Sequence, residues 1–451
     1  MERRGANLGL PLPRFALRHR RRGSARSGSQ TACARGRFGE EVTASPGPIV
    51  VVGGGLTGGT AAATLREDGF DGDLTLIGAE SHPPYERPPL SKSFLRGETP
   101  FEEAHVRTRE FWSERDVTLR LGTTVQAVDT DARTLTLSDG DTVAFDTLLL
   151  ATGARNRRFP IPGIELLGVF DLRTVDDAER IRDAAEAGAH AVVVGMGFIG
   201  SEVSASLRSR GVQVTAVEHS SVPLARVLGE DVGRVLAGVH ADQGVTCRFG
   251  DGLASFDGKG RVETVVTASG ERIDCDFAVI GMGVQPNVEI ANGTPLEVDN
   301  GIVVDEFCRT NVEGVFAAGD VANHYRPMFG TRIRVEHWDN ARRQGRAAAR
   351  SMLGTGAPYD DVPWFWSDQY DQHLQYAGFH MEWDDLVVRG SLDERDFVAF
   401  YLKDGVPQAA VALNRNHELR SAMPLLKART PVPPETLRDE DADLATLAPP
   451  S

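Results

Sequence analysis

Two glycine-rich fingerprints of the form G-x-G-x-x-G constrain this chain more than any other feature of its sequence. The first begins at Gly53, after the apolar run Ile49–Val52, and the second begins at Gly195, after the apolar run Ala191–Val194. In such a unit the first glycine permits a tight turn, the second lets a pyrophosphate approach the backbone, and the third lets the following helix pack on the strand. The two motifs therefore predict two dinucleotide-binding βαβ units in an α/β fold, with the glycines Gly53, Gly55, Gly58, Gly195, Gly197 and Gly200.

An acidic residue follows the second strand of each predicted unit. Glu80 comes shortly after the expected strand Leu74–Ile77, and Glu218 comes directly after the expected strand Val212–Val217. A carboxylate at this position can accept hydrogen bonds from the ribose hydroxyls of a dinucleotide. Glu218 would repel a 2′-phosphate and no arginine comes directly after it, so we expect NADH to be preferred over NADPH. For the first unit, Asp73 remains open as the ribose contact, and a solvated acid remains open for either position.

The rest of the chain shows strand patterns and a separate C-terminal region. Between the fingerprints the expected strands are Thr118–Val128, Thr134–Leu137 and Thr147–Leu150. A helix is expected over Asn340–Met352, followed by a linker over residues 354–363. A small α+β domain is predicted after the linker, from the expected strands Leu386–Gly390, Phe397–Leu402 and Ala409–Leu413. Proline and acidic residues are frequent over residues 428–451, where we expect a loose tail.

Charge is distributed unevenly along the chain. The formal net charge is -15, although residues 1–38 contain ten arginines and only Glu2 as an acid. The remaining body is strongly acidic, which argues against general binding of nucleic acid. The basic arm, residues 1–47, has no apolar periodicity, so we expect it to be disordered. An organelle presequence, a nucleic-acid-binding arm and a dispensable or misassigned upstream segment remain open for it.

The cysteines and the hydropathy of the chain indicate a cytoplasmic protein. The cysteines form no C-x-x-C pair, so the sequence predicts neither a metal site nor a dithiol; they are Cys33, Cys247, Cys275 and Cys308. Scattered thiols fit a reducing cytosol. No run of about 18 or more apolar residues is present, so no membrane-spanning segment is predicted.

Six segments together resemble one enzyme family. They are Val51–Thr60, Pro84–Lys92, Ala151–Gly153, Gly200–Glu202, Val315–Val321 and Phe365–Tyr370. With them, residues 48–425 resemble the NADH:ferredoxin reductases of bacterial oxygenase systems. These belong to the FAD-dependent pyridine nucleotide-disulfide oxidoreductase superfamily and include putidaredoxin reductase and rubredoxin reductase. The resemblance implies one non-covalently bound FAD and two Rossmann-like domains in the glutathione-reductase-like arrangement, with a small α+β C-terminal domain.

The resemblance and the strand pattern together set the expected domain boundaries. The FAD-binding domain is expected to be discontinuous and to enclose the NAD-binding domain in sequence. The expected segments are the basic arm 1–47, the FAD-binding segments 48–157 and 278–357, the NAD-binding domain 158–277, the C-terminal reductase domain 358–425 and a tail 426–451.

The resemblance implies a reaction site where the two cofactors meet. It places Lys92 beside the flavin ring, Glu202 opposite the nicotinamide, Trp338 against the isoalloxazine and Trp366 nearby from the C-terminal domain. Opposite charges away from water are costly singly and tolerable as a pair. We therefore expect the Lys92 ammonium to lie within about 4 Å of the Glu202 carboxylate. A solvated lysine, a helix acid without a shared role, and tryptophans that only fill the core remain open.

Further cofactor contacts are also implied by the resemblance. Asp320 is expected to hydrogen-bond the ribityl chain of FAD, and Arg87 and Arg155 are expected to be additional FAD contacts. Arg226 is expected to hold the phosphate or adenine of NAD, with a plain surface charge as the alternative. No cysteine occurs in the segment Leu90–Phe94, where relatives with thiol chemistry carry one, so thiol-based chemistry is not expected.

The expected function is electron transfer from NADH through FAD to a small iron–sulfur ferredoxin. The chain has no cysteine cluster of its own for such a centre, so the ferredoxin would be a separate protein. Seven arginines over Arg326–Arg350 suggest its docking surface, with pairing of these arginines to acids elsewhere on the surface as the alternative. Two alternatives remain open: reduction of a quinone, monodehydroascorbate or oxygen, and an NADH-binding signalling flavoprotein like apoptosis-inducing factor. A monomer or weak homodimer is expected.

Overall fold

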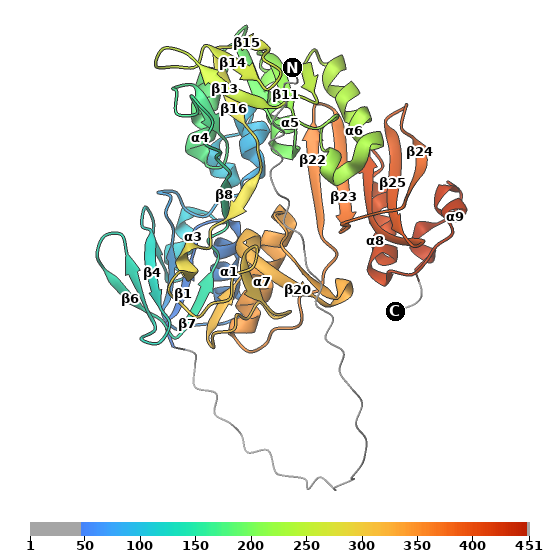
Figure 1. The fold of residues 1–451 in the computed structure, drawn as a ribbon. Coiled ribbons are helices and arrows are strands. Elements are labelled where there is room, and N and C mark those ends of the chain that lie inside the picture. Colours follow the sequence, from blue (N-terminus) through green and yellow to red (C-terminus); the bar gives the residue numbers. More distant parts are fainter. Residues whose placement is uncertain (1–46, 449–451) are drawn as a thin grey trace, which may run out of the picture. The chain divides into compact units, whose positions relative to one another are not determined.

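The computed structural model describes residues 47–448 of the chain (Figure 1). Apart from Gly47, the predicted basic arm over residues 1–47 lies outside the described residues. Two parallel sheets with helices packed against them form two Rossmann-like units, and an antiparallel sheet forms a C-terminal unit. The predicted fold class, α/β with two Rossmann-like domains and a small C-terminal domain, is confirmed.

The first parallel sheet is built around the strand that precedes the first fingerprint. Its strands are, in spatial order, β19 (Val315–Ala317), β7 (Thr147–Leu150), β1 (Ile49–Val52), β2 (Leu74–Ile77) and β3 (Val117–Arg120). Helices α1 (Leu56–Glu67) and α7 (Trp338–Met352) cover one face. The antiparallel strands β4 (Val125–Asp129), β5 (Thr134–Leu137) and β6 (Thr142–Ala144) lie over the other face. Because both faces are covered, β1 is apolar at every position and at most 5% exposed.

The second parallel sheet repeats this construction around the second fingerprint. Its strands are, in spatial order, β12 (Thr246–Phe249), β11 (Gln213–Glu218), β10 (His190–Val194), β16 (Phe277–Ile280) and β9 (Val169–Asp171). Helices α4 (Val175–Ala184) and α5 (Phe198–Ser209) pack on one face. A small sheet of β13 (Leu253–Asp257), β14 (Thr264–Thr267) and β15 (Arg272–Asp274) packs on the other. The strands predicted beside both fingerprints are thus present.

The predicted domain boundary at residue 278 is wrong because it cuts through β16. This strand pairs in parallel with β10, so it belongs to the second sheet. The chain leaves the second unit only afterwards, through β17 (Val284–Pro286). β17 pairs antiparallel with β8 (Ala154–Asn156), through which the chain enters that unit. Pairing between strands distant in sequence sets the boundary, and no local pattern reveals it.

The single strand predicted over Thr118–Val128 is in fact two strands in different sheets. β3 ends at Arg120 and pairs in parallel with β2, whereas β4 begins at Val125 and pairs antiparallel with β5. Gly122, with φ of 65°, lies in the turn between them. A backbone in this region favours glycine and cannot continue an extended strand.

The C-terminal unit is an antiparallel sheet that packs between a helix of the second unit and a helix of its own. Its strands are, in spatial order, β22 (Trp364–Gln369), β23 (Gln372–Gly378), β26 (Val406–Leu413), β25 (Asp396–Lys403) and β24 (Asp385–Ser391). One face packs against α6 (Ala225–Asp242) of the second unit, and the other packs against α8 (Asn416–Ala428) (Figure 1). All three strands predicted here are present.

The prediction that the tail segment 426–451 is loose from residue 428 onward is wrong for its described part. Leu437, in α9 (Pro434–Arg438), and Leu444 are at most 2% exposed and belong to the core of the C-terminal unit. Arg389 of β24 donates hydrogen bonds to the backbone carbonyls of Asp439, Glu440 and Ala442. Proline and acidic residues hide this anchoring in the sequence, because the leucines and the distant arginine that contribute to it form no local pattern.

Shorter elements complete the described chain. They are η1 (Pro88–Ser91), α2 (Ser93–Arg96), η2 (Phe101–Ala104), α3 (Arg109–Glu114), η3 (Glu289–Ala291), β18 (Ile302–Val304), η4 (Gly319–Val321), β20 (Ala322–Arg326), η5 (Pro327–Phe329), β21 (Thr331–Ile333) and η6 (Leu444–Thr446).

Candidate functional site

The glycines of the first fingerprint have three different environments. Gly53 has a φ of 122°, and a Cβ there would lie 2.1 Å from the carbonyl oxygen of Ala151. A Cβ on Gly58 would lie 2.0 Å from the carbonyl oxygen of Gly53, so this position needs glycine for helix and strand to approach. Around Gly55, no described atom lies within 4 Å of such a Cβ. The open side of Gly55, at the start of α1, is where a pyrophosphate can approach backbone N–H groups.

The second fingerprint has the same three environments. Gly195 has a φ of 91°, and its Cβ would lie 2.6 Å from the carbonyl oxygen of Gly281. A Cβ on Gly200 would lie 1.8 Å from the carbonyl oxygen of Gly195. Gly197 faces open space, with none of the described atoms within 4 Å of a Cβ. Both fingerprints therefore fit a dinucleotide in the same way.

Glu218 is held against the second fingerprint. Its carboxylate accepts hydrogen bonds from the backbone N–H of Met196 at 2.6 Å and of Ser220 at 2.8 Å. These bonds place an acid at the carboxyl end of β11, beside the open glycine. Arg226 is exposed in the first turn of α6, which follows the loop after Glu218. Their contacts with ribose and with the phosphate or adenine remain predictions.

Glu80, Arg87 and Asp320 belong to one hydrogen-bonded cluster. The Arg87 guanidinium donates to the Glu80 carboxylate at 2.8 Å, and the Tyr85 hydroxyl donates to the other oxygen of that carboxylate. Arg87 also donates to the backbone carbonyl of Arg173, whose guanidinium pairs with Asp320 at 2.8 Å. Burial raises the pKa of the Tyr85 phenol, which keeps it a donor. Sequence reasoning missed Arg173, which no motif marks.

Lys92 and Glu202 form a close ion pair. The Lys92 ammonium lies 2.6 Å from the Glu202 carboxylate, and the two side chains are 12% and 3% exposed. Lys92 follows η1 in the first unit, and Glu202 lies in the first turns of α5 in the second unit. The predicted approach of these charges within 4 Å is confirmed. This is the one pair of opposite charges that the predicted site residues bring together across the two units.

Two serines that sequence reasoning missed complete the surroundings of Glu202. Ser91 donates to one carboxylate oxygen at 2.5 Å, and Ser367 of β22 donates to the other at 2.8 Å. Both serines lie in segments that carried the family resemblance. Ser91 could have been suspected from its place beside Lys92. The alternation of β22 would have placed Ser367 on the same face as Phe365 and Gln369.

The two predicted tryptophans are also in contact. The rings of Trp338, the first residue of α7, and Trp366 of β22 meet edge to face with centroids 5.4 Å apart. Trp364 stacks on Trp366 at 5.5 Å. The Arg342 guanidinium lies 4.7 Å from the Trp338 ring centroid. The contact of either tryptophan with a flavin remains a prediction.

Arg155 is engaged elsewhere. On β8, its guanidinium pairs with Glu289 at 2.5 Å and donates to Asn287 at 2.8 Å. These contacts stabilise the strand pair through which the chain crosses between the two units. The structure therefore gives Arg155 a structural partner and does not join it to the Lys92–Glu202 pair; its role as an FAD contact remains a prediction.

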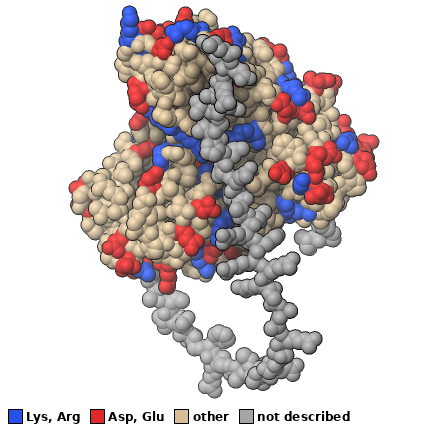
Figure 2. Space-filling view, viewed as in Figure 1, with Lys and Arg blue, Asp and Glu red and all other residues tan. Residues whose placement is uncertain are grey.

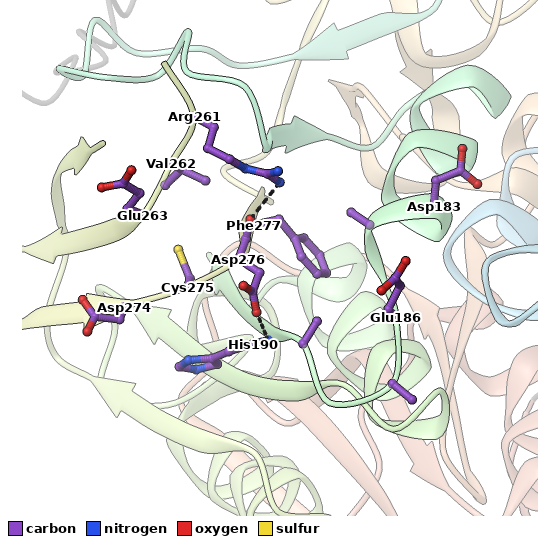
Figure 3. Close-up of a pocket in the computed structure, with 13 residues that line it drawn as sticks. Asp183, Glu186, His190, Arg261, Val262, Glu263, Asp274, Cys275, Asp276 and Phe277 are labelled. Carbon is purple, nitrogen blue, oxygen red and sulfur yellow. Dashed lines mark hydrogen bonds between the residues drawn. The ribbon is translucent and has the colours of Figure 1, made fainter. Parts of the chain in front are cut away.

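A cavity of about 740 Å³ lies at the amino ends of β10 and β16, the end of the second sheet away from the fingerprint (Figure 3). It is lined by His190 and Phe277, which begin β10 and β16, and by Asp276, whose carboxylate accepts from the backbone N–H of His190 at 2.8 Å. Further acids, Asp183, Glu186, Glu263 and Asp274, surround it. Ligands of parallel α/β sheets bind at the carboxyl ends of the strands, and acids repel a pyrophosphate. This cavity is therefore not the dinucleotide site.

Three further findings concern metal ions, the membrane and the buried thiols. Within residues 47–448, no cluster of His, Cys, Asp and Glu side chains could hold a metal ion. None of the described helices is long and apolar enough to cross a membrane. Burial raises the pKa values of Cys275 and Cys308 to about 12, so both thiols stay protonated.

Comparison with known proteins places the chain in a family. The pyridine nucleotide-disulphide oxidoreductase family matches residues 47–345, and the reductase C-terminal family matches residues 364–448. Rhodocoxin reductase of Rhodococcus erythropolis is 40% identical over 397 residues, which cover 88% of this chain and 93% of that protein. The anthranilate 1,2-dioxygenase system ferredoxin–NAD(+) reductase component of Burkholderia cepacia is 37% identical, over 89% of this chain and 100% of that protein.

A solved structure agrees with these relatives. The reductase chain in the crystal structure of the covalent putidaredoxin reductase–putidaredoxin complex superposes with a TM-score of 0.86 at 34% identity, over 89% of this chain and 98% of that one. The family and its named relatives imply FAD and NAD(H) as cofactors, which the two fingerprints fit. The chain therefore belongs to the pyridine nucleotide-disulphide oxidoreductase family and carries that family's reductase C-terminal domain.

Proposed function

We propose that this protein passes electrons from NADH through FAD to a small iron–sulfur ferredoxin that serves an oxygenase. One observation carries the proposal: a buried ion pair joins the two dinucleotide-binding units, with Lys92 from the first and Glu202 from the second. The names of the relatives, which are reductase components of oxygenase systems, support the choice of acceptor. When bound, FAD supplies the chemistry that accepts a hydride and releases electrons singly.

The residues of the chain would divide the work of binding. We propose that FAD is bound by the open glycine Gly55, by the cluster of Glu80, Arg87 and Asp320, and by the rings of Trp338 and Trp366. We propose that NADH is bound by Gly197, Glu218 and Arg226. The glycines expose backbone N–H groups to the pyrophosphates, the acids accept from ribose and ribityl hydroxyls, and the rings exclude water from the flavin.

Lys92 and Glu202 would act where the two cofactors meet. With FAD bound, the ammonium of Lys92 would lie ready to stabilise negative charge on the reduced cofactor, an interaction that would be stronger in the transition state than before it. Glu202 neutralises Lys92 beforehand and can accept a hydrogen bond from the nicotinamide amide. Because the pair is nearly excluded from water, each electrostatic contact is stronger there than at the surface.

The proposal is tested by two linked measurements. Stopped-flow absorbance should show rapid bleaching of the flavin by NADH, and the reduced protein should reduce cytochrome c only when a ferredoxin is added. Equal cytochrome c reduction without ferredoxin, or rapid reduction of a quinone or oxygen, would favour the small-acceptor alternative. Slow flavin reduction with a stable NADH complex would favour a signalling flavoprotein.

Glu218 is expected to make the protein selective for NADH. Its carboxylate is fixed at the end of β11 by the backbone of Met196 and Ser220, so it cannot turn away from a 2′-phosphate. We expect kcat/KM with NADH to be about tenfold higher than with NADPH, which corresponds to about 1.4 kcal/mol. Initial rates with ferricyanide measure this ratio. Glu218→Gln should narrow it, and equal efficiency of the wild type with both nucleotides would contradict the expectation.

The predicted arginine docking surface is narrower in the structure than in the sequence. Arg326 is 1% exposed, and Arg350 lies in the last turn of α7, at the other end of the helix from Trp338, where it pairs with Asp68. Arg342, whose guanidinium lies over the Trp338 ring, and Arg343 are 34% and 46% exposed; both pair with Asp339, and Arg343 also pairs with Asp361. Figure 2 shows Lys and Arg side chains gathered near the middle of the face that it draws. A cationic surface of this kind would attract an acidic ferredoxin.

Removing both of these charges is expected to weaken ferredoxin docking. Arg342→Gln with Arg343→Gln should raise the KM for ferredoxin about fivefold and flatten its salt dependence, because long-range attraction is lost. NADH-to-ferricyanide activity should stay unchanged. Arg350→Gln, on the same helix, is the matched control and should leave the ferredoxin KM unaltered. An unchanged KM in the double variant would place docking elsewhere.

Two coarser predictions concern the setting of the protein. We propose that it works in the cytoplasm, where its scattered thiols stay reduced, and as a monomer or weak homodimer. Light scattering of the FAD-loaded protein over a range of concentrations tests the second point.

A further inference from the structure

The C-terminal unit contributes a buried hydroxyl to the ion pair between the other two units. Ser367, 0% exposed on β22, donates to the Glu202 carboxylate at 2.8 Å. The side-chain amide of Gln369, on the same face of β22, donates to the Ser367 hydroxyl at 3.2 Å. Ser367 is thus both a donor and an acceptor, which fixes the direction of its single proton towards Glu202.

Aromatic packing holds β22 in this place. Phe365, two residues before Ser367, meets Phe198 at the start of α5 edge to face, with centroids 4.6 Å apart. It also contacts His337, beside the start of α7, at 4.3 Å. Phe365, Ser367 and Gln369 are the buried positions of an alternating strand. The strand is therefore pinned between α5 and α7, and the serine cannot shift without moving these rings.

The Glu202 carboxylate is held from two sides. One oxygen accepts from Ser91 at 2.5 Å and from Lys92 at 2.6 Å, and the other accepts from Ser367. Ser206, one turn after Glu202 on α5, donates to the backbone carbonyl of Ser91 at 2.7 Å and ties that loop to the helix. The terminal torsion of a glutamate is broad. Without Ser367, one oxygen loses this donor and the carboxylate is held through its other oxygen alone, by Ser91 and Lys92.

We propose that Ser367 is a positioning residue of the hydride-transfer site, which makes the C-terminal unit a working part of that site. The proposal rests on the proposed function, since it assumes that Lys92 and Glu202 act on the NADH-to-FAD step. Ser367 acts through Glu202: it fixes the carboxylate, and the fixed carboxylate fixes the Lys92 ammonium. Its loss affects the rate of the step and leaves the binding of either cofactor almost unchanged.

The test is stopped-flow reduction of the FAD-loaded protein over a range of NADH concentrations. Ser367→Ala should lower the limiting rate of flavin reduction about tenfold, the size expected for one hydrogen bond to a buried charged group. The apparent Kd for NADH should change less than about twofold. FAD content and melting temperature should match the wild type. Gln369→Met, which removes the donor to Ser367, should act in the same direction with a smaller effect.

Two controls separate positioning from a structural role. Ser204→Ala removes another fully buried serine of the same neighbourhood, on α5, whose hydroxyl lies 3.7 Å from the Met196 sulfur. The flavin of the Ser204→Ala protein should be reduced by NADH at the wild-type rate. In a Glu202→Ala background, Ser367→Ala should slow reduction by less than about twofold further, because no carboxylate remains to be positioned.

The outcomes distinguish this inference from the proposed function. If NADH fails to reduce the wild-type flavin, the proposed function itself is wrong. If the wild type is reduced and Ser367→Ala keeps its limiting rate, only the inference is overturned. A parallel fall of FAD content, melting temperature and rate, or an undiminished effect in the Glu202→Ala background, would likewise overturn it.

Discussion

Replacing Lys92 with alanine is expected to slow flavin reduction at saturating NADH by about 10- to 100-fold, with FAD still bound. The ammonium lies 2.6 Å from Glu202 and almost out of solvent, so its loss removes the charge that meets the developing negative charge. It also leaves a buried carboxylate held only by serine hydroxyls. FAD should stay bound because the fingerprint around Gly55, which would hold its pyrophosphate, is untouched.

Stopped-flow absorbance measures the limiting rate, and released flavin measures FAD content. Lys259→Ala, which changes an exposed lysine on a loop of the second unit, is the matched control and should reduce normally. A Lys92→Ala protein that is reduced at the wild-type rate would show that the ion pair is structural only.

Acid is expected to destabilise the protein well before its carboxylates are protonated. His240 and His324 are 0% and 1% exposed. Burial lowers the pKa of His240 from 6.5 to about 4, and burial together with Arg326 lowers the pKa of His324 to about 3. Between these values and 6.5 the unfolded chain binds more protons than the folded one. The free energy of unfolding is therefore at its full value above pH 6.5 and decreases as the pH falls below 6.5.

The expected decrease in the free energy of unfolding is large for two histidine side chains. At pH 5 each imidazole should contribute about 2 kcal/mol less to the free energy of unfolding than at pH 7.5, or about 4 kcal/mol together. Urea unfolding of the FAD-loaded wild type and of single histidine variants at both pH values measures each contribution, because His337 and His380, whose pKa values burial also lowers to about 4, add to the loss of the wild type. His324→Gln should lose about 2 kcal/mol less than the wild type between the two pH values. His417→Gln, at an exposed histidine, should lose the same as the wild type. An equal loss in His324→Gln would contradict the assignment.

The sequence by itself determined the parts of this protein that local pattern encodes. Each fingerprint lies between a buried strand and a helix, and the roles assigned to Gly53, Gly55 and Gly58 match their environments in the structure. Strands such as Ile49–Val52 were predictable because a strand buried on both faces must be apolar at every position. The family resemblance added the pairing of Lys92 with Glu202, which no spacing in the sequence shows.

Only the tertiary structure decided how the units complete one another. The contact of Ser367 with Glu202 joins residues 165 positions apart, and that of Arg173 with Asp320 joins residues 147 apart. Such contacts depend on how β22 packs against α5 and on how the two Rossmann-like units meet. The assignment of β16 to the second sheet likewise depends on its non-local pairing with β10. Short-range propensities carry no information about these contacts, because their energy appears only after the separate units have packed together.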